Sequence, residues 1–287
     1  MSAESFRDWL LSPPLLWQMR FGERCALEGI LARVRPRLSI EIGTAGGGSL
    51  YHVAAASGEV HSFDIDPGVT QLARHFDNVE FHVGNSAVLV PETLRALGEQ
   101  HKKVDFALVD GDHSAEGVKR DAQALLEAEA CAKTVIVFHD AANEDVRAGL
   151  EAMRFPGQPR VALALLDFVP GYLVESGVRR FQIWNGLALV VLDEGHSGPA
   201  LTDGDFFDVA ALYRRVRDDL RAEQDHAKHE GAAASLADEL ETCARERDEL
   251  RLALEDVQRS LSWRITSPLR AAKRVVRGRR NDRSATG

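Results

Sequence analysis

Polar residues follow five apolar runs in the first half of the chain, at the point where each run ends. They are Glu41, Asp64, Asn85, the group Asp110, Asp112 and His113, and the pair His139 and Asp140. Carboxylates and imidazoles gathered in one place can hold a divalent cation, bind hydroxyl groups or move a proton. One acid after a strand is an ordinary turn former or helix cap, but capping is a poor explanation for five consecutive strands. The pattern therefore predicts one polar site assembled from several strand ends.

A glycine-rich segment follows the first of these runs. Residues 38–42, Leu-Ser-Ile-Glu-Ile, are short, apolar and partly β-branched, which is typical of a buried strand. The segment Gly43-Thr44-Ala45-Gly46-Gly47-Gly48-Ser49 comes next, and residues 49–56 are predicted to form a helix. Bare main chain beside a helix N-terminus suits a nucleotide-like ligand at the end of a parallel sheet. An ordinary structural turn is the alternative, because the spacing differs from the dinucleotide-binding pattern G-x-G-x-x-G.

Strands and helices alternate through the central part of the chain. Strands are predicted at 38–42, 60–65, 79–83, 104–109 and 134–138, and helices at 49–56, 69–75, 86–98 and 115–130. Five such units in series predict a doubly wound, mostly parallel α/β sheet with right-handed crossovers. In this architecture the carboxyl ends of the strands form the ligand crevice. Residues 161–169 and 187–192 are predicted as an antiparallel pair at the sheet edge, which gives seven strands.

Four regions are expected along the chain. They are N-terminal helices at 1–37, the sheet domain at 38–200, a coiled-coil helical region at 205–262 and a basic amphipathic tail at 263–287. Pro13-Pro14 is expected to end a first short helix, and residues 21–34 carry apolar residues at helical spacing. Apolar residues between 209 and 261 recur at four- and three-residue intervals with one polar interruption, Arg247, which is typical of a coiled-coil seam. An amphipathic helix packed on the sheet domain is the alternative reading.

Composition and charge narrow the class of protein. The net charge is −9, but from Arg264 onward eight Lys and Arg residues face one acid, Asp282. An acidic body argues against nucleic-acid binding, whereas the basic tail is either solvated or suited to an anionic membrane surface. The sequence contains no apolar run of the roughly 20 residues that span a bilayer. Its first residues lack a basic segment followed by an apolar core, so we do not expect a signal peptide. Three cysteines far apart in sequence fit a reducing compartment. We therefore expect a cytoplasmic protein, with peripheral contact at the inner membrane face as an additional expectation.

The glycine segment and the strand-end acids resemble the class I S-adenosylmethionine-dependent methyltransferases. Residues 41–49 resemble the first motif of this family, E-x-G-x-x-x-G, and Asp64 matches the acid that binds the ribose hydroxyls. The segment Gly84-Asn85-Ser86 resembles the family's adenine-contacting segment. The resemblance covers residues 21 to 192 and implies a Rossmann-like fold. The cofactor-binding residues that it implies are Glu41, Gly43, Thr44, Gly46, Ser49, Asp64, Asn85, Ser86 and Asp110.

The sequence Asp110-Gly111-Asp112-His113, together with His139-Asp140, is similar to metal-assisted O-methyltransferases, including those that act on sugar hydroxyls. The resemblance implies a divalent metal, Mg²⁺ or Mn²⁺, held by Asp110, His139 and Asp140. It also implies that Asp110 and His113 are catalytic, with His113 as the base that accepts a proton near neutral pH, close to its unperturbed pKa of about 6.5. His139 stands where the family usually has an acid, and imidazole suits softer metals than magnesium. The alternative is that Asp140 caps a helix, His139 contacts substrate and no metal binds.

The segment at 262–270, Ser-Trp-Arg-Ile-Thr-Ser-Pro-Leu-Arg, resembles an ending found on bacterial glycosyltransferases and methyltransferases of surface-polysaccharide assembly. It implies a sugar or glycan acceptor in the synthesis of a cell-surface polysaccharide or glycolipid. The coiled coil implies a homo-oligomer or a partner protein. Three other functions stay open: an O-methyltransferase of a small secondary metabolite, a non-catalytic assembly scaffold, and a hydroxylase that uses His139 beside Asp140.

Overall fold

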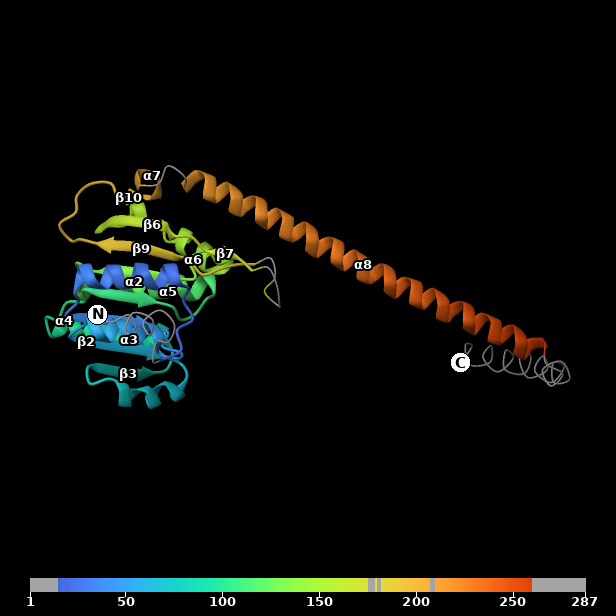
Figure 1. Ribbon diagram of the computed structural model, residues 1–287, viewed down its shortest axis with the longest axis horizontal. Coiled ribbons are helices and arrows are strands. Elements are labelled where there is room, and N and C mark those ends of the chain that lie inside the picture. The colour runs from blue at the N-terminus through green and yellow to red at the C-terminus, as the bar shows by residue number, and fades with distance from the viewer. Residues whose placement is uncertain (1–14, 175–178, 180–181, 207–209, 260–287) are drawn as a thin grey trace, which may run out of the picture. The chain divides into compact units, whose positions relative to one another are not determined.

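The structure is a computed structural model that describes residues 15–174, 179, 182–206 and 210–259 (Figure 1). It divides into two units, 1–221 and 222–287, each of which is described by itself. The first unit contains an eight-stranded sheet with helices on both faces, and it holds all the strand-end residues singled out above. The expected helix before Pro13-Pro14 and the tail at 263–287 lie outside the described residues.

Five parallel strands form the main part of the sheet. They are β1 (Leu38–Ile42), β2 (Glu59–Asp64), β3 (Val79–Val83), β4 (Phe106–Val109) and β5 (Val135–His139). Their order in space is β3-β2-β1-β4-β5, with Leu38 opposite Glu59 and Ser39 opposite Phe106. The strand order reverses beside β1, so the ends of β1 and β4 meet at the switch point of a doubly wound sheet. The predicted architecture is confirmed for this part of the chain.

The remaining strands complete one edge of the sheet (Figure 1). Strand β9 (Leu187–Leu192) is antiparallel to β6 (Val161–Val169), as predicted, and it is also antiparallel to β5, which was not predicted. The expected count of seven strands is one too low, because the two-residue strand β10 (Leu201–Thr202) pairs in parallel with β6. A two-residue strand carries too little periodicity to be recognised in sequence. A separate pair, β7 (Tyr172–Leu173) and β8 (Ile183–Trp184), forms a small hairpin.

Alternate residues of the strands bury opposite faces of the sheet. Ile40 and Ile42 pack with α4 (Ser86–Glu99), α5 (Ala115–Glu127) and α6 (Glu144–Ala152) in one hydrophobic cluster. Helices α2 (Phe21–Val34) and α3 (Gly48–Ala56) pack on the other face with Val60, Phe106 and Leu108. The period of two along each strand therefore decides which residues reach α3 and which reach α4.

The segment predicted as an α-helix at 69–75 is instead a 3₁₀ helix, η1 (Pro67–His75). Its first turn contains Gly68 and two β-branched residues, which lower α-helix propensity. Asp66 begins the element, since its side chain accepts a hydrogen bond from Gly68 N at 2.8 Å. Two further short 3₁₀ turns are η2 (Glu129–Cys131) and η3 (Phe155–Gly157).

A short helix, α7 (Asp203–Phe206), precedes the long helix α8 (Ala210–Arg259), which has 50 residues. Helix α8 lies within the region predicted as a coiled coil at 205–262, and the coiled coil itself stays a prediction. Leu236, Leu240 and Leu250 of the expected seam are each more than 60% exposed. No helix among the described residues is both long enough and apolar enough to cross a membrane.

Candidate active site

A cavity of about 510 Å³ lies at the carboxyl ends of the parallel strands. Predicted site residues line it from five successive strand ends. They are Gly43, Asp64, Asn85, Ser86, Asp110, His113, His139 and Asp140. The expectation of one polar site built from several strand ends is therefore met by the fold. Gln18, Ile65 and Arg120 also line the cavity, and sequence reasoning did not single them out.

Gly43 holds β1 against β4 at the switch point. Its φ is +93°, and a Cβ at this position would overlap the backbone carbonyl of Asp110. Asp110 N in turn donates a hydrogen bond to Ile42 O at 2.7 Å. A side chain at residue 43 is thus excluded both by backbone conformation and by space. The close approach of these two strands brings the glycine segment next to Asp110.

Asp64 organises the backbone of the glycine segment. Its Oδ2 accepts hydrogen bonds from Thr44 N and Ala45 N, both at 2.9 Å, and its Oδ1 accepts one from Asp66 N at 2.8 Å. A carboxylate has about four acceptor positions, so Asp64 keeps capacity for a ligand hydroxyl on the cavity side. The carboxylate therefore both shapes the loop and faces the cavity.

Glu41 lies beneath the glycine segment and does not line the cavity. It is fully buried, with Ser49 Oγ donating to Oε1 at 2.7 Å and Ser62 Oγ donating to Oε2 at 3.4 Å. Thr44 is also turned inward, since its hydroxyl lies 2.6 Å from Ser62 Oγ. Burial raises the pKa of Glu41 to about 8, against the opposing effect of the Ser49 hydrogen bond. These residues form a polar support below the loop.

The chain covers part of its own glycine segment. Leu16 forms a parallel bridge with Gly47, and a Cβ on Gly46 or Gly48 would collide with Leu16 or Trp17. Thr44, Gly46 and Ser49 are accordingly in the walls of a much smaller recess of about 30 Å³. Two of the four glycines therefore allow close approach of residues 16 and 17, where bare main chain for a ligand was expected.

Asp110, His113, His139 and Asp140 converge at the other end of the cavity. Asp110 Oδ1 lies 2.9 Å from His139 Nδ1 and 3.3 Å from His113 Nε2. His113 Nε2 is also 3.2 Å from Asp140 Oδ2. Ligand atoms of Asp110, His139 and Asp140 lie within 4.8 Å of one another, which is compact enough for one cation. The residues at the carboxyl ends of β4 and β5 thus form a single histidine–carboxylate cluster.

The charge of this cluster changes the expected behaviour of His113. Hydrogen bonds from its ring to Asp110 and Asp140 raise the pKa of His113 to about 9. The expectation of titration near 6.5 is therefore wrong for this arrangement, because the two carboxylates stabilise the imidazolium. His113 holds a proton at neutral pH here, and it becomes a base only when other positive charge compensates those carboxylates.

Two residues that sequence reasoning missed hold His139 from behind. Glu23 Oε1 lies 3.3 Å from His139 Nε2, and Asn185 Nδ2 lies 3.3 Å from the same nitrogen. Burial alone would lower the pKa of His139, yet Asp110, Glu23 and Asp140 raise it well above its ordinary value. A carboxylate on one imidazole nitrogen fixes the ring and leaves the other nitrogen for a cation. Glu23 could be read from sequence only as a helix-start residue, since it accepts from Arg20 N at 2.7 Å.

A protein-family model described as a methyltransferase domain matches residues 40–141. The matched segment runs from β1 to just after β5, and it contains the glycine segment, Asp64 and the histidine–carboxylate cluster. Residues 40–141 are therefore similar to a methyltransferase domain.

The chain is also similar to solved structures at low sequence identity, and it covers most of each. A cofactor-bound protein, Rv0187 from MTB, is 21% identical, with 67% of this chain and 96% of that chain covered and a TM-score of 0.48. An O-methyltransferase from Bacillus cereus in complex with SAH is 19% identical, with coverage of 66% and 88% and a TM-score of 0.47. The O-methyltransferase TomG from Streptomyces achromogenes, involved in tomaymycin synthesis and bound to SAM, is 20% identical, with coverage of 67% and 87% and a TM-score of 0.45. No curated protein matches the chain.

Aromatic side chains lie near the cluster in the sheet domain. Trp184 on β8 lies edge-on to His113, with ring centroids 6.1 Å apart. The guanidinium of Arg179 lies 3.8 Å from the centre of the Trp184 ring, and that of Arg20 lies 3.0 Å from the centre of the Tyr172 ring. The β7–β8 hairpin therefore presents flat, half-buried rings beside the acidic end of the cavity.

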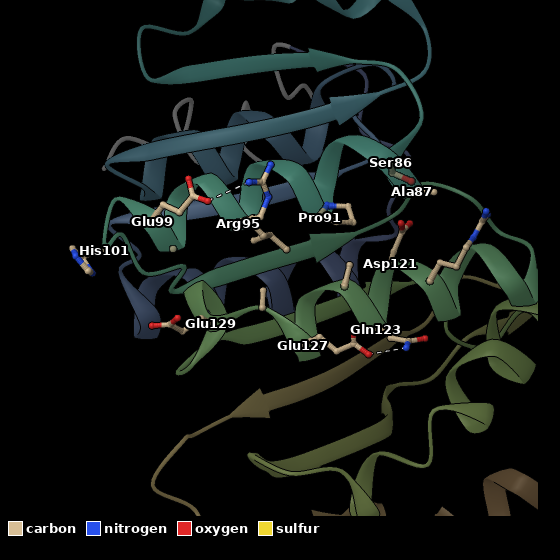
Figure 2. A pocket seen from close by; sticks show the side chains of 15 residues that line it. Ser86, Ala87, Pro91, Arg95, Glu99, His101, Asp121, Gln123, Glu127 and Glu129 are labelled. Atoms are coloured by element: carbon tan, nitrogen blue, oxygen red, sulfur yellow. Dashed lines mark hydrogen bonds and ion pairs between the residues drawn. The ribbon is translucent and has the colours of Figure 1, made fainter.

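A larger cavity of about 710 Å³ lies between α4 and α5 of the same domain (Figure 2). Several of its polar residues pair along their own helix: Arg95 donates to Glu99 at 3.2 Å, and Gln123 donates to Glu127 at 2.7 Å. Asp121 points from α5 toward α4 near Ser86 (Figure 2), and burial raises its pKa to about 6. The strand-end cavity is the better candidate despite its smaller volume, because Gly43, Asp64 and the histidine–carboxylate cluster all line it.

Proposed function

We propose that this protein is an S-adenosylmethionine-dependent O-methyltransferase that acts on a sugar hydroxyl in the synthesis of a cell-surface polysaccharide or glycolipid. One observation carries the proposal. The Asp110–His113–His139–Asp140 cluster shares a cavity with the glycine segment and Asp64. A methyl donor at the glycine end would place its reactive group near the cluster, and alignment of donor and acceptor supplies much of the rate in such a transfer.

The glycine end of the cavity suits the cofactor. Asp64 offers a carboxylate to a ribose diol, and Asn85 and Ser86 provide polar groups at the start of α4. The Asn85 side chain already accepts from Ala87 N at 3.0 Å, so a donor on its amide remains for an adenine ring. The carboxylates of the cluster also favour a cationic sulfonium. We therefore assign the cofactor to this end through Gly43, Asp64, Asn85, Ser86 and Asp110.

The cluster suits a divalent cation held by Asp110, His139 and Asp140. Glu23 on the far side of His139 leaves Nδ1 directed at Asp110, which is the arrangement that an imidazole ligand needs. The imidazole favours Mn²⁺ over Mg²⁺. A bound cation would lower the pKa of an acceptor hydroxyl. With the carboxylates compensated, His113 loses the interaction that retains its proton and can accept the proton of the acceptor.

The acceptor side supports a sugar. Arg179 covers one face of Trp184, and the other face could stack on the C–H face of a sugar ring while His113, which lies beside Trp184, reaches the hydroxyl edge of the sugar. The segment at 262–270 carries the link to surface polysaccharides, and it lies outside the described residues. A small phenolic metabolite could use the same aromatic wall, so acceptor preference has to be measured directly.

The C-terminal third supports a partner. The exposed Leu236, Leu240 and Leu250 of α8 follow the spacing of a coiled-coil seam, and burying them would require another helix. We propose that α8 pairs with α8 of a second copy or with a helix of a partner protein. The basic residues from Arg264 onward would add contact with an anionic membrane face.

Calorimetric binding of S-adenosylmethionine tests the cofactor assignment. We expect wild type to bind and Asp64→Asn to bind about 10- to 100-fold more weakly, since a hydrogen bond to a charged group contributes about 1.5–3 kcal/mol. Asp66→Asn is the matched control, because asparagine can still cap η1, and it should bind as wild type does. EDTA should leave binding intact. Absence of binding by wild type would overturn the proposal.

Methyl transfer tests the acceptor assignment. Labelled methyl donor is offered with Mn²⁺ or Mg²⁺ to lipid-linked oligosaccharides, free monosaccharides and a simple phenol. We expect transfer to a sugar hydroxyl that EDTA abolishes and Mn²⁺ restores. Transfer to the phenol alone would show that the acceptor is a small metabolite and not a sugar. Transfer that EDTA does not affect would show that methyl transfer does not need a metal.

A metal-dependent hydroxylase is the second candidate function, and the geometry of His113 favours it. His113 Nε2 lies 3.2 Å from Asp140 and 3.3 Å from Asp110, so a second imidazole contacts both carboxylates of the Asp110, His139 and Asp140 group. Two histidines and one carboxylate are the ligand set of non-haem iron oxygenases. Oxygen-dependent turnover with Fe²⁺, without turnover of S-adenosylmethionine, would select this function.

A further inference from the structure

A second histidine cluster lies on the sheet, on the two strands farthest from β9. Glu59 and His61 belong to β2, and Glu80 and His82 belong to β3, the edge strand. The register sets His61 opposite Glu80, and alternate residues of paired strands share a face, so the four side chains lie on one side of the sheet. None of these four described residues lines the strand-end cavity or the cavity between α4 and α5. The cluster is therefore separate from the candidate active site.

Three ligand atoms of this cluster surround one point. His61 Nδ1 lies 2.9 Å from His82 Nε2. Glu80 completes the triangle, with Oε2 3.7 Å from His61 Nδ1 and Oε1 3.6 Å from His82 Nε2. Zinc–ligand distances of about 2.0–2.2 Å in a tetrahedron place neighbouring ligand atoms about 3.3–3.6 Å apart. Shifts of a few tenths of an ångström, together with small rotations of the two imidazoles, would bring His61 Nδ1, His82 Nε2 and one Glu80 oxygen into coordination of a single ion.

Other contacts hold both imidazole rings in place. Glu59 Oε1 lies 3.1 Å from His61 Nε2, and Lys102 Nζ lies 2.8 Å from both oxygens of Glu59. The His82 ring stacks on Phe63 with centroids 4.5 Å apart and an interplanar angle of 13°. A carboxylate on the outer nitrogen of a histidine is the usual support of a metal-bound imidazole. Neighbouring side chains therefore hold the imidazole rings of both histidine ligands in position.

We propose that His61, Glu80 and His82 bind Zn²⁺, with water in the fourth position. Two imidazoles and one carboxylate are a ligand set for zinc that leaves a position open. The Glu80 side chain is 64% exposed, so an ion can reach the site from solvent. The ion links β3 to β2, and the carboxyl end of β3 leads directly into Asn85 of the strand-end cavity. Zinc would therefore stabilise the edge of the sheet that carries this part of the cavity wall.

Zinc binding by the untagged full chain tests the proposal. Competition with a chromophoric chelator gives stoichiometry and affinity, and Co²⁺ absorption reports tetrahedral coordination. Wild type and His82→Gln are each compared with and without Asp110→Asn, which removes a ligand from the strand-end cluster. We expect His82→Gln to lose one zinc per chain in both backgrounds, together with the tetrahedral Co²⁺ bands and the rise in melting temperature with Zn²⁺.

Two further variants keep the test independent of folding defects. Glu80→Gln changes an exposed side chain and should weaken zinc binding about 10- to 100-fold, while His75→Gln removes an exposed histidine of η1 and should change nothing. A direct hydrogen bond between the two imidazoles would explain their 2.9 Å separation without any ion. Equal zinc stoichiometry in wild type, His82→Gln and Glu80→Gln would establish that explanation and overturn the proposal.

Discussion

The two ends of the strand-end cavity are assembled from the chain in different ways. The glycine end comes from residues 43–86, in which consecutive strands β1, β2 and β3 each contribute the residues at their own end. The cluster end joins the ends of β4 and β5 to Glu23 of α2 and to Asn185 beside β8. The first is shaped mainly by backbone, and the second mainly by charged side chains.

This difference separates the expected effects of mutation. Changes at the glycine end should alter folding or cofactor affinity, because they displace main chain against main chain. Changes at the cluster end should alter turnover with little effect on cofactor affinity, because they alter charge and proton position. A variant at the glycine end that changes only turnover, or a variant at the cluster end that changes cofactor affinity, would contradict this separation of the two ends.

The largest effect is expected for Gly43→Ala. The new Cβ would overlap the Asp110 carbonyl in a backbone conformation of φ +93°, so β1 and β4 would have to separate. We expect a loss of about 4 kcal/mol or more in the free energy of unfolding, measured by urea denaturation, and loss of cofactor binding. Gly29→Ala is the control, since it lies in α2 with no atom near its Cβ, and it should be neutral or stabilising by about 0.5–1 kcal/mol. Stability of Gly43→Ala equal to wild type would contradict the role of this contact.

His113→Gln should produce the largest effect at the cluster end. Glutamine keeps polar contact with Asp110 but cannot accept the proton of the acceptor, so turnover should fall about 10²- to 10⁴-fold. The cofactor dissociation constant, measured by calorimetry, should stay within about twofold of wild type if the ends act separately. Weakened cofactor binding with turnover retained would assign His113 to the cofactor and sink its role as base.

Much of the glycine end could be predicted from sequence because its determinants are local. The strand before Gly43 and the helix at 21–34 have the predicted bounds, since apolar periodicity, glycine and proline mark both. Outside the glycine end, the bounds of strands β6 and β9 were also predicted. Each of these elements is specified by a few adjacent residues.

Contacts between distant segments could not be predicted in the same way. The contact of Leu16 with the glycine segment depends on where the N-terminal residues pack after folding, and so does the contact of Glu23 with His139. The raised pKa of His113 depends first on Asp110, three residues before it, but also on its distance to Asp140 just after β5, which no spacing in the sequence specifies. The sequence therefore identified the carboxylates and histidines of the cluster, while the fold determined the contacts that stabilise the protonated form of His113.

The pH dependence of stability tests the support beneath the glycine segment. Burial raises the pKa of Glu41 to about 8 from its usual 4.5, so the folded protein retains a proton that the unfolded chain releases. Stability from this group is therefore full below pH 4.5 and falls as the pH rises toward 8. Glu41→Gln should remove this loss and be more stable than wild type by about 3 kcal/mol at pH 7, but not at pH 4.5, by urea denaturation. Glu92→Gln, an exposed change on α4, should leave the wild-type profile unaltered.

The smallest effect is expected for Glu23→Gln, which tests whether the cluster end depends on residues far from it in sequence. Asn185 Nδ2 and Gly186 N donate to different oxygens of Glu23, so glutamine can keep the hydrogen bond from only one of them, and it also removes the negative charge that faces His139 Nε2. We expect turnover to fall about 10- to 100-fold and more Mn²⁺ to be needed for half-maximal activity, with cofactor affinity unchanged. Glu28→Gln on the same helix is the control, because its carboxylate pairs with His52 and should affect neither quantity. If the Mn²⁺ requirement of Glu23→Gln equals that of wild type, Glu23 only caps α2, and the cluster end is as local as the glycine end.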